Sequence, residues 1–117
     1  AVCPVDPDFK HYYLSPRLCV ENLIRGAEIE AADLGQSRTM IMPGRTLTIR
    51  QMIEAMTAVA GPEPAKLIRF EDDPAIRDIV SGWRFDYDPA KALALGLEAD
   101  DSFEDNVRHY LEDDRPA

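Results

Sequence analysis

Between residues 10 and 27 the sequence changes from a strand-like aromatic segment to a helix within two residues. Ser15 can accept a hydrogen bond from a free backbone N–H of the first helical turn. Pro16 fits the first helical position, where its missing N–H costs nothing. This pair predicts that a helix begins at Pro16, and the rest of the chain must pack around this corner between a strand and a helix.

The predicted helix has two faces of opposite character. Apolar side chains recur at helical spacing and predict the buried face, and polar side chains predict the solvent-exposed face. The apolar face contains Cys19, Val20, Leu23, Ile24 and Ala27, and the polar face contains Glu21, Asn22, Arg25 and Glu28. We therefore expect Cys19 to act as a small buried hydrophobic residue and Asn22 to face water.

The segment that leads into this helix carries the densest cluster of polar groups able to hold an anion. Lys10, His11, Tyr12 and Tyr13 lie in the strand-like approach, and Arg17 lies in the first helical turn. The helix dipole disfavours a cation at a helix start, and this cost favours an anionic partner for Arg17. The alternatives are a surface position for Arg17 and a structural, hydrogen-bonded role for His11.

Length and charge exclude several classes of protein. The 117 residues suffice for one domain with a core and are too few for two ordinary ones. No apolar run approaches the roughly 20 residues of a membrane span, and the sequence does not start with a signal segment. A net charge of −9 disfavours a nucleic-acid partner, because phosphate binding requires a basic stripe. Acids are dense after residue 98, and residues 112–117 are predicted to form a frayed acidic tail.

The cysteine and histidine residues do not form a metal motif. Cys3 and Cys19 lie too far apart for a metal-binding pair, and His11 and His109 complete no ligand spacing. Free thiols are typical of a reducing compartment, so the two cysteines favour a cytoplasmic location.

Strand patterns occur at three places outside the aromatic segment. Residues 1–9 contain two prolines and predict an extended edge segment or linker. The apolar residues 39–42 predict a strand buried on both faces, as in a parallel sheet. The alternation over residues 66–71 predicts a further strand.

Four more helices have readable starts. The clearest begins at Thr48, where Gln51 completes a capping box, and ends at Gly61. Its Met-rich apolar face is predicted to fill the core rather than to form a binding groove. The other three follow Asp73, Asp88 and Ser102, and the first of these is predicted to bury Ile76, Ile79, Val80 and Trp83. The pattern predicts an α/β fold, α+β in isolation, that is helix-rich with two or three short strands. So thin a sheet requires other strands beside it.

Several motifs give the chain a resemblance to a known family. They are Lys10 to Arg17 before the first helix, Arg38 to Gly44, Leu47 to Ala60, and Asp88-Pro89 with Lys91 and Leu95-Gly96. In this order they resemble the second half of extended short-chain dehydrogenases/reductases, the NAD-dependent epimerase/dehydratase family. Within that family the chain is most similar to the branch that contains D-erythronate dehydrogenase. Lys10 stands where that branch has arginine, and lysine cannot reproduce a bidentate guanidinium contact.

The resemblance implies the C-terminal, substrate-side portion of a dehydrogenase without its dinucleotide-binding half. The parent enzyme would use NAD or NADP, and the chain alone would bind neither, because its sequence lacks the glycine-rich turn that holds a pyrophosphate. In a branch that acts on a sugar acid, one wall of the cleft must hold the carboxylate of this small anion. The substrate-binding candidates are Lys10, His11, Ser15, Arg17 and Arg69.

Tyr87 and Lys91 have the spacing of the family's catalytic Tyr-x-x-x-Lys pair. Catalysis requires both residues one turn apart on a helix, so that the ammonium lowers the pKa of the phenol. Asp88 and Pro89 predict that a helix begins between them, which leaves Tyr87 outside it. We therefore predict that this pair is not catalytic, and the chain offers no other catalytic candidate.

Two functions of different classes are consistent with the sequence. The first is a fragment of an NAD-dependent oxidoreductase or epimerase-like enzyme that acts on a small hydroxy acid or sugar derivative and is inactive alone. The second is a free-standing acidic binding or interaction module that descends from that domain. A strand over residues 39–42 at an open sheet edge disfavours the second, because such an edge promotes aggregation. A homodimer or a domain-swapped oligomer would cover that edge.

Overall fold

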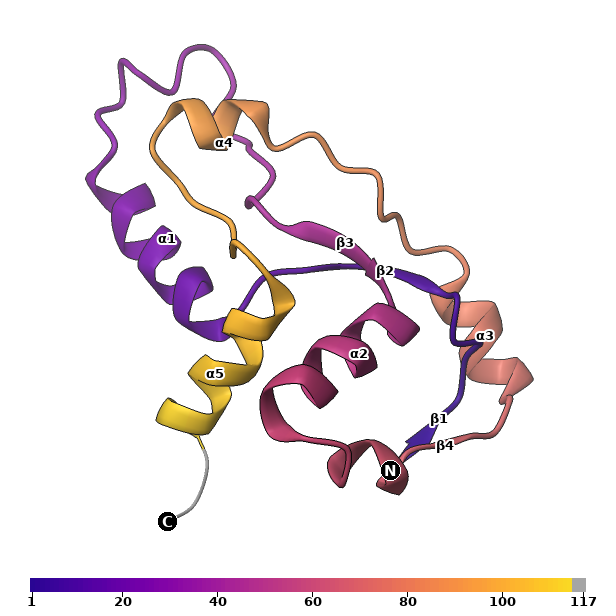
Figure 1. The fold of residues 1–117 in the computed structure, drawn as a ribbon. Helices are drawn as coiled ribbons and strands as arrows, with labels where there is room; N and C mark the ends of the chain where they lie inside the picture. The colour runs from indigo at the N-terminus through magenta and orange to yellow at the C-terminus, as the bar shows by residue number, and fades with distance from the viewer. Residues whose placement is uncertain (115–117) are drawn as a thin grey trace.

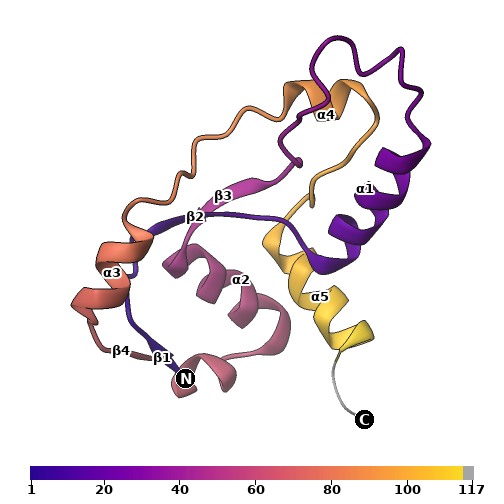
Figure 2. The same ribbon diagram turned by 180° about the vertical axis from the view of Figure 1, so that it is seen from behind.

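A computed structural model describes residues 1–114 of the chain (Figures 1 and 2). The elements are β1 (Val2–Cys3), β2 (Lys10–Tyr13), α1 (Pro16–Glu28), β3 (Arg45–Thr48), α2 (Ile49–Ala60), the 3₁₀ helix η1 (Pro64–Leu67), β4 (Arg69–Phe70), α3 (Pro74–Val80), α4 (Ala90–Ala94) and α5 (Phe103–Asp113). The predicted helix-rich α/β character is confirmed, with four short strands in these residues instead of two or three. No helix of the described part is long and apolar enough to cross a membrane.

The strands of residues 1–114 form two pairs. β1 runs parallel to β4, with Val2 opposite Arg69. β2 runs antiparallel to β3, with Lys10 opposite Thr48. Figures 1 and 2 show the β2–β3 pair crossing the middle of the molecule, with α2 on one side and the coil between α3 and α4 along the other. The β2–β3 pair thus carries side chains toward two different layers.

Four of the five predicted helix starts follow the predicted capping chemistry. The exception is α4, which begins at Ala90 with Pro89 as its N-cap, one residue later than predicted, although the Asp88 carboxylate still accepts from the Ala90 N–H at 2.9 Å. The Ser15 hydroxyl accepts a hydrogen bond from the Leu18 N–H at 3.2 Å, and Thr48 and Gln51 form a complete capping box. Asp73 and Ser102 cap α3 and α5 in the same way. These predictions are confirmed because a cap depends on residues within one turn.

Two of the predicted strands differ in the structure. Residues 39–42 lie outside any strand, because a strand needs a neighbour to pair with and the residues that pair with β2 begin only at Arg45. Within residues 66–71 only Arg69 and Phe70 are in a strand. Pro64 begins a 3₁₀ turn that continues through Leu67 and delays the start of β4.

The predicted faces of α1 are wrong in part. Leu23 and Ile24 are 60% and 58% exposed, whereas Asn22, which was expected to face water, is 1% exposed. The Asn22 Nδ2 donates to the Glu98 carbonyl at 2.7 Å, and its Oδ1 accepts from the Glu98 N–H at 2.9 Å. This double hydrogen bond holds Asn22 against the loop after α4, whereas Glu21 and Glu28 of the predicted polar face are exposed as expected.

Few apolar side chains are fully buried within residues 1–114. Those that are buried are Pro43, Ala55, Ala92 and Leu97. The prediction that Ile79 and Trp83 face inward is also wrong, because both are more than half exposed. The radius of gyration is 16.6 Å, whereas a compact domain of this length has about 13 Å, and the shortest extent is 19 Å. The described residues form a flat layer with apolar surface on its outside.

Gly44 lies where the chain passes close to β2 before β3 begins. A Cβ atom at this position would be 2.5 Å from the Tyr13 carbonyl oxygen and 2.7 Å from the Tyr12 ring. We expect Gly44→Ala to cost roughly 1–3 kcal/mol of unfolding free energy, because the backbone must move to relieve the overlap. Urea unfolding followed by circular dichroism measures this cost.

Gly26→Ala is the matched control for this change. Nothing lies within 4 Å of a Cβ added to Gly26, which sits inside α1. Alanine is the better helix former, so this variant is expected to stabilise the chain by roughly 0.5–1 kcal/mol. If Gly44→Ala unfolds at the same urea midpoint as the wild type, the close approach of Gly44 to Tyr12 and Tyr13 is contradicted.

Candidate functional site

Lys10 is the predicted site residue whose charge is left uncompensated. It begins β2, is exposed, and holds its ammonium 5.3 Å from the centre of the Phe85 ring. In the part of the chain that the structure describes, Lys10 forms no ion pair. Its ammonium is therefore available to an anion.

The Phe85 ring belongs to an irregular segment, residues 83–87, that lies beside β3. Aromatic and charged residues alternate in this segment, as in a strand. The Thr46 hydroxyl donates to the Phe85 carbonyl and ties the segment to β3. Arg84 pairs with Asp86 at 3.1 Å, so these two charges are satisfied within the segment.

Aromatic contacts hold the same segment to β2. The rings of His11 and Trp83 are 6.0 Å apart with planes inclined at 42°. The ring of Tyr87 packs edge-on against that of Tyr12 at 4.9 Å. Burial raises the pKa of Tyr12, whose hydroxyl donates to the Met42 carbonyl at 2.9 Å. Tyr12 thus acts as a structural anchor beneath the segment.

These contacts create what we call the aromatic–cation surface, made of Lys10, His11, Trp83, Phe85 and Tyr87. The three rings of residues 83–87 remain 39–55% exposed. An ammonium can bind a carboxylate through a charge-assisted hydrogen bond, and exposed rings can pack against the C–H groups of a sugar derivative. The surface is therefore suited to a small anion that also carries carbon–hydrogen bonds.

Ser15 has a structural role in this chain. Its hydroxyl caps α1, and its backbone N–H donates to the Asp100 Oδ2 at 2.7 Å. Both Ser15 and Asp100 are buried. Contact between Ser15 and a substrate stays a prediction.

Arg17 and Arg69 differ from Lys10 because each forms an ion pair with an acid of this chain. The Arg17 guanidinium binds both oxygens of Asp113, at 2.8 and 2.9 Å, and also Glu112 at 2.9 Å. Arg69 lies in β4 and pairs with Glu71 at 3.3 Å. Of the predicted site residues, the described structure brings Lys10 and His11 together on one surface, whereas Arg17 and Arg69 each meet an acid of this chain.

The acids that meet Arg17 come from the segment predicted as a frayed tail. Glu112 and Asp113 instead belong to the last turn of α5, because the pairing with Arg17 holds this turn against α1. Residues 115–117 of the predicted tail lie outside the described residues.

The Arg17–Asp113 contact should make the stability of the chain depend on pH. The hydrogen bonds from Arg17 hold the pKa of Asp113 below its ordinary value of 3.8. A lowered carboxyl pKa stabilises the folded chain above that ordinary value, and this contribution is lost as the pH falls through the lower folded value. The melting temperatures of wild type and Arg17→Gln should therefore differ most near neutral pH and converge below about pH 4.

The exposed Arg38 supplies the control for this pH dependence. Arg38→Gln removes the same charge without touching α5, and its melting curve should follow the wild type at every pH. A difference between wild type and Arg17→Gln that stays constant down to pH 2 would contradict the assigned contact.

The sequence reasoning missed Trp83, Phe85 and Tyr87 as site residues. The available signal was the alternation of aromatic and charged residues, which is typical of a strand-like segment with one aromatic face. Trp83 was instead assigned to the inner face of the preceding helix, which in the structure ends at Val80.

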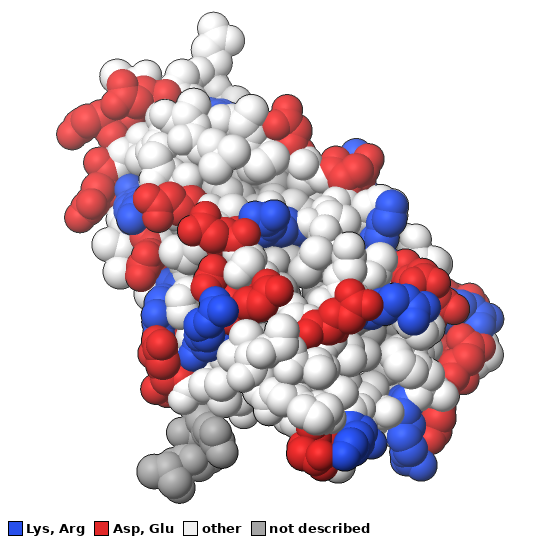
Figure 3. Space-filling view, viewed as in Figure 1, with Lys and Arg blue, Asp and Glu red and all other residues white. Residues whose placement is uncertain are grey.

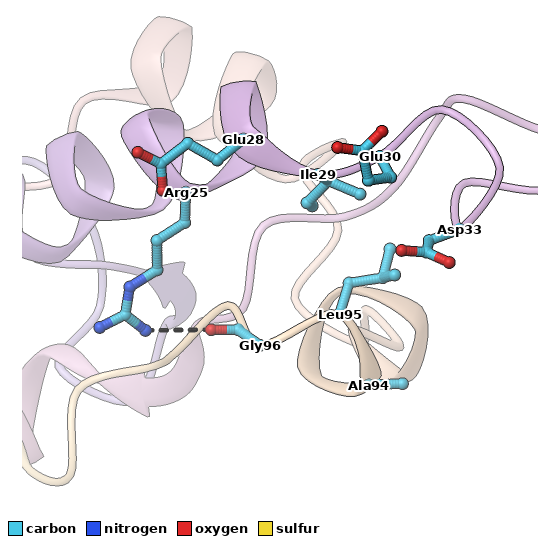
Figure 4. A pocket seen from close by; sticks show the side chains of 8 residues that line it. All are labelled: Arg25, Glu28, Ile29, Glu30, Asp33, Ala94, Leu95 and Gly96. Carbon is cyan, nitrogen blue, oxygen red and sulfur yellow. Dashed lines mark hydrogen bonds between the residues drawn. The ribbon is translucent and has the colours of Figure 1, made fainter.

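A hollow of about 630 Å³ lies between the end of α1 and α4 (Figure 4). Arg25 lines it, but its guanidinium donates to the Gly96 carbonyl at 3.0 Å and pairs with Glu98. The remaining charges that line the hollow are acidic: Glu28, Glu30 and Asp33. An anion would be repelled here, so this hollow is a poorer candidate than the aromatic–cation surface.

The surface charges do not form a nucleic-acid interface on the face drawn in Figure 3. Acidic and basic side chains are interspersed over that face, without a continuous basic stripe. Within residues 1–114, no group of three or more His, Cys, Asp or Glu side chains is arranged to hold a metal ion.

Comparison with known proteins identifies relatives over almost the whole chain. No family model matches. The chain is 38% identical to a D-erythronate dehydrogenase of Cupriavidus necator and 33% identical to one of Haemophilus influenzae, in each case over 97% of its own residues. It covers 35% and 36% of those two proteins, so it spans about a third of the length of the curated relatives it matches.

Solved structures extend this relationship. The chain superposes with a TM-score of 0.92 and 37% identity on the nucleoside-diphosphate-sugar epimerase from Agrobacterium tumefaciens, over 97% of this chain and 33% of that one. The chain is homologous to the C-terminal part of extended short-chain dehydrogenases/reductases. A GalE-like L-threonine dehydrogenase from Cupriavidus necator shares the fold, with a TM-score of 0.78 at 21% identity over 97% of this chain and 36% of that one.

The extended short-chain dehydrogenases/reductases use a helical Tyr-x-x-x-Lys pair, and Tyr87 and Lys91 do not reproduce its geometry. Lys91 lies in α4, whereas Tyr87 lies in the coil before it and packs on Tyr12. The Lys91 ammonium donates to the Ser37 carbonyl. The prediction that Tyr87 stands outside the helix is confirmed.

The NAD pyrophosphate of this family requires free N–H groups at a helix N-terminus. In the described residues, the N-termini of α1, α2, α3 and α5 are each closed by a side chain of their own N-cap residue: Ser15, Thr48, Asp73 and Ser102. The N-cap residue of α4, Pro89, supplies no such bond. That this chain alone binds no dinucleotide stays a prediction.

Proposed function

We propose that this chain forms the substrate-side wall of an NAD-dependent oxidoreductase that acts on a small hydroxy acid or related sugar derivative. In this proposal the chain is inactive alone, and the cofactor and the catalytic groups belong to a dinucleotide-binding half that precedes it in the longer polypeptide. The relatives named D-erythronate dehydrogenase support a sugar acid as the substrate class.

The observation that carries the proposal is the uncompensated ammonium of Lys10 on the aromatic–cation surface. The net charge of the chain is −9, and the nearby Arg84 pairs with an acid, whereas Lys10 forms no ion pair within residues 1–114 and holds its ammonium over the Phe85 ring. In the proposed enzyme Lys10 binds the substrate carboxylate, Trp83 and Phe85 pack against its carbon chain, and His11 donates or accepts a hydrogen bond at a hydroxyl.

The outer surface of the chain supports a larger parent. The apolar face of α1 is exposed, and the flat shape buries little apolar area. Association with a second layer would remove this area from water, which stabilises a protein by about 25 cal/mol per Å². A free-standing binding module would need a self-sufficient core instead. The few buried apolar side chains within residues 1–114 do not favour that alternative. The free thiols of Cys3 and Cys19 support a reducing, cytoplasmic compartment.

Titration with NAD and NADP tests where the cofactor binds. We expect this chain to show no heat of binding in calorimetry, because its sequence lacks the glycine-rich turn that holds a pyrophosphate. We expect the full-length polypeptide that carries it to bind NAD or NADP. Binding of either dinucleotide to this chain alone would contradict the proposal.

A further inference from the structure

An apolar groove of about 550 Å³ runs between α2, α5 and β1. Six of the side chains that line it are Met52, Ile53, Met56, Phe103, Val107 and Tyr110, and no charged side chain takes part in the lining. The Met-rich face of α2, which was predicted to fill the core, therefore borders an open groove. Such a groove exposes apolar surface at a cost that a packed segment would remove.

One polar atom in this groove has no partner. The Asn106 Nδ2 is buried without a hydrogen-bond acceptor within residues 1–114. A buried donor left unsatisfied costs about 1–3 kcal/mol. An occupant of the groove should therefore be apolar and should also present an oxygen acceptor, a combination that the side chains and backbone carbonyls of a peptide segment provide.

The start of the chain lies at the same groove. Ala1 and Val2 belong to its lining, and the Ala1 nitrogen donates to the Leu67 carbonyl at 2.6 Å. A peptide N–H can make the same bond, so the contact persists when residues precede Ala1. A polypeptide that continues before Ala1 therefore starts beside the groove, and the relatives are about three times as long as this chain.

We propose that the groove is filled by the polypeptide segment that directly precedes Ala1 in the longer enzyme. This segment packs apolar side chains against Met52 and Met56, and one of its oxygen atoms accepts from the Asn106 Nδ2. The inference rests on the proposed function, because it requires that the chain is the C-terminal part of a longer protein. The inference assigns the α2–α5 groove to the segment directly before Ala1. The apolar face of α1 is then covered by other parts of the longer enzyme.

Methionine oxidation by hydrogen peroxide, read by mass spectrometry, tests this assignment. The chain has four methionines, Met40, Met42, Met52 and Met56, and the first two lie outside the groove. We expect Met52 and Met56 to oxidise severalfold more slowly in a chain extended by its native preceding segment than in this chain, and Met40 and Met42 to oxidise at unchanged rates. Equal oxidation rates at Met52 and Met56 in the two proteins would overturn the proposal. Protection of Met52 and Met56 that appears only when this chain is concentrated enough to dimerise would also overturn it, because a second copy of the chain would then fill the groove.

Asn106→Leu gives a second readout, which is the direction in which it shifts the melting temperature. In this chain the variant removes an unpartnered buried donor and should raise the melting temperature. In the full-length polypeptide it leaves the accepting oxygen without its partner and should lower the melting temperature. The same sign in both proteins would overturn the proposal.

The Leu67→Glu variant is the control for the full-length measurement, because Leu67 is 69% exposed and does not line the groove. It should change neither the oxidation rates of Met52 and Met56 nor the direction in which Asn106→Leu shifts the melting temperature. Protection of the groove in a full-length polypeptide that fails to oxidise sugar acids would sustain this inference and refute the proposed function. A full-length polypeptide that oxidises sugar acids but leaves the groove unprotected would sustain the proposed function and refute this inference.

Discussion

Asn22→Ala is expected to lower the unfolding free energy of this chain by about 2–4 kcal/mol, the range for a buried polar group whose removal leaves partners unsatisfied. The Asn22 side chain makes both hydrogen bonds of the Glu98 backbone, 76 residues away in sequence. Alanine would leave this N–H and this carbonyl without their partner at a partly buried site. It would also release the contact between α1 and the loop after α4.

Urea unfolding followed by circular dichroism measures this loss. Glu21→Ala is the matched control, because Glu21 is the exposed neighbour on the same helix and should change the midpoint little. A cost below about 0.5 kcal/mol for Asn22→Ala, the range of ordinary surface changes, would contradict the assigned role.

Lys10→Met in the full-length polypeptide is expected to raise the KM for a sugar acid by roughly 10- to 100-fold, with a smaller effect on kcat. This range corresponds to the loss of a charge-assisted hydrogen bond of about 1.5–3 kcal/mol. Methionine keeps the length of the side chain and its apolar contact with Phe85, so the change isolates the charge. Steady-state kinetics with saturating NAD separates the effect on KM from that on kcat.

Two further variants make the Lys10 measurement specific. Lys10→Arg restores the charge and should recover most of the affinity, since a guanidinium also binds a carboxylate. Lys66→Met removes an exposed lysine that already pairs with Glu63, and it should leave the kinetics unchanged. If Lys10→Met and Lys66→Met behave alike, the aromatic–cation surface does not hold the carboxylate.

Helix starts could be predicted from the sequence because their chemistry is local. Ser15, Thr48, Asp73 and Ser102 each cap a helix through a backbone N–H two or three residues away. The hydrophobic pattern of α1 gave the wrong face for the opposite reason. The partner of Asn22 lies in a loop near the other end of the chain, and local periodicity contains no information about it.

The candidate site was predicted in part for the same physical reason. Lys10 and His11 were found because they stand together in sequence next to a recognisable helix start. The rings that complete the surface reach β2 from residues 83–87, and this pairing depends on tertiary packing. Likewise, the partner of Arg17 lies 96 residues away, so its engagement by Asp113 could not be read from the first helical turn.

Reduction of NAD by the full-length polypeptide that carries this chain, with D-erythronate and related sugar acids as substrates, tests the proposed function most directly. We expect NADH to form with the full-length polypeptide and at least one sugar acid, and no NADH to form with this chain alone. Turnover by this chain alone, or a full-length polypeptide that binds NAD but oxidises none of the sugar acids, would contradict the assignment of this chain as the substrate-side wall of a sugar-acid dehydrogenase.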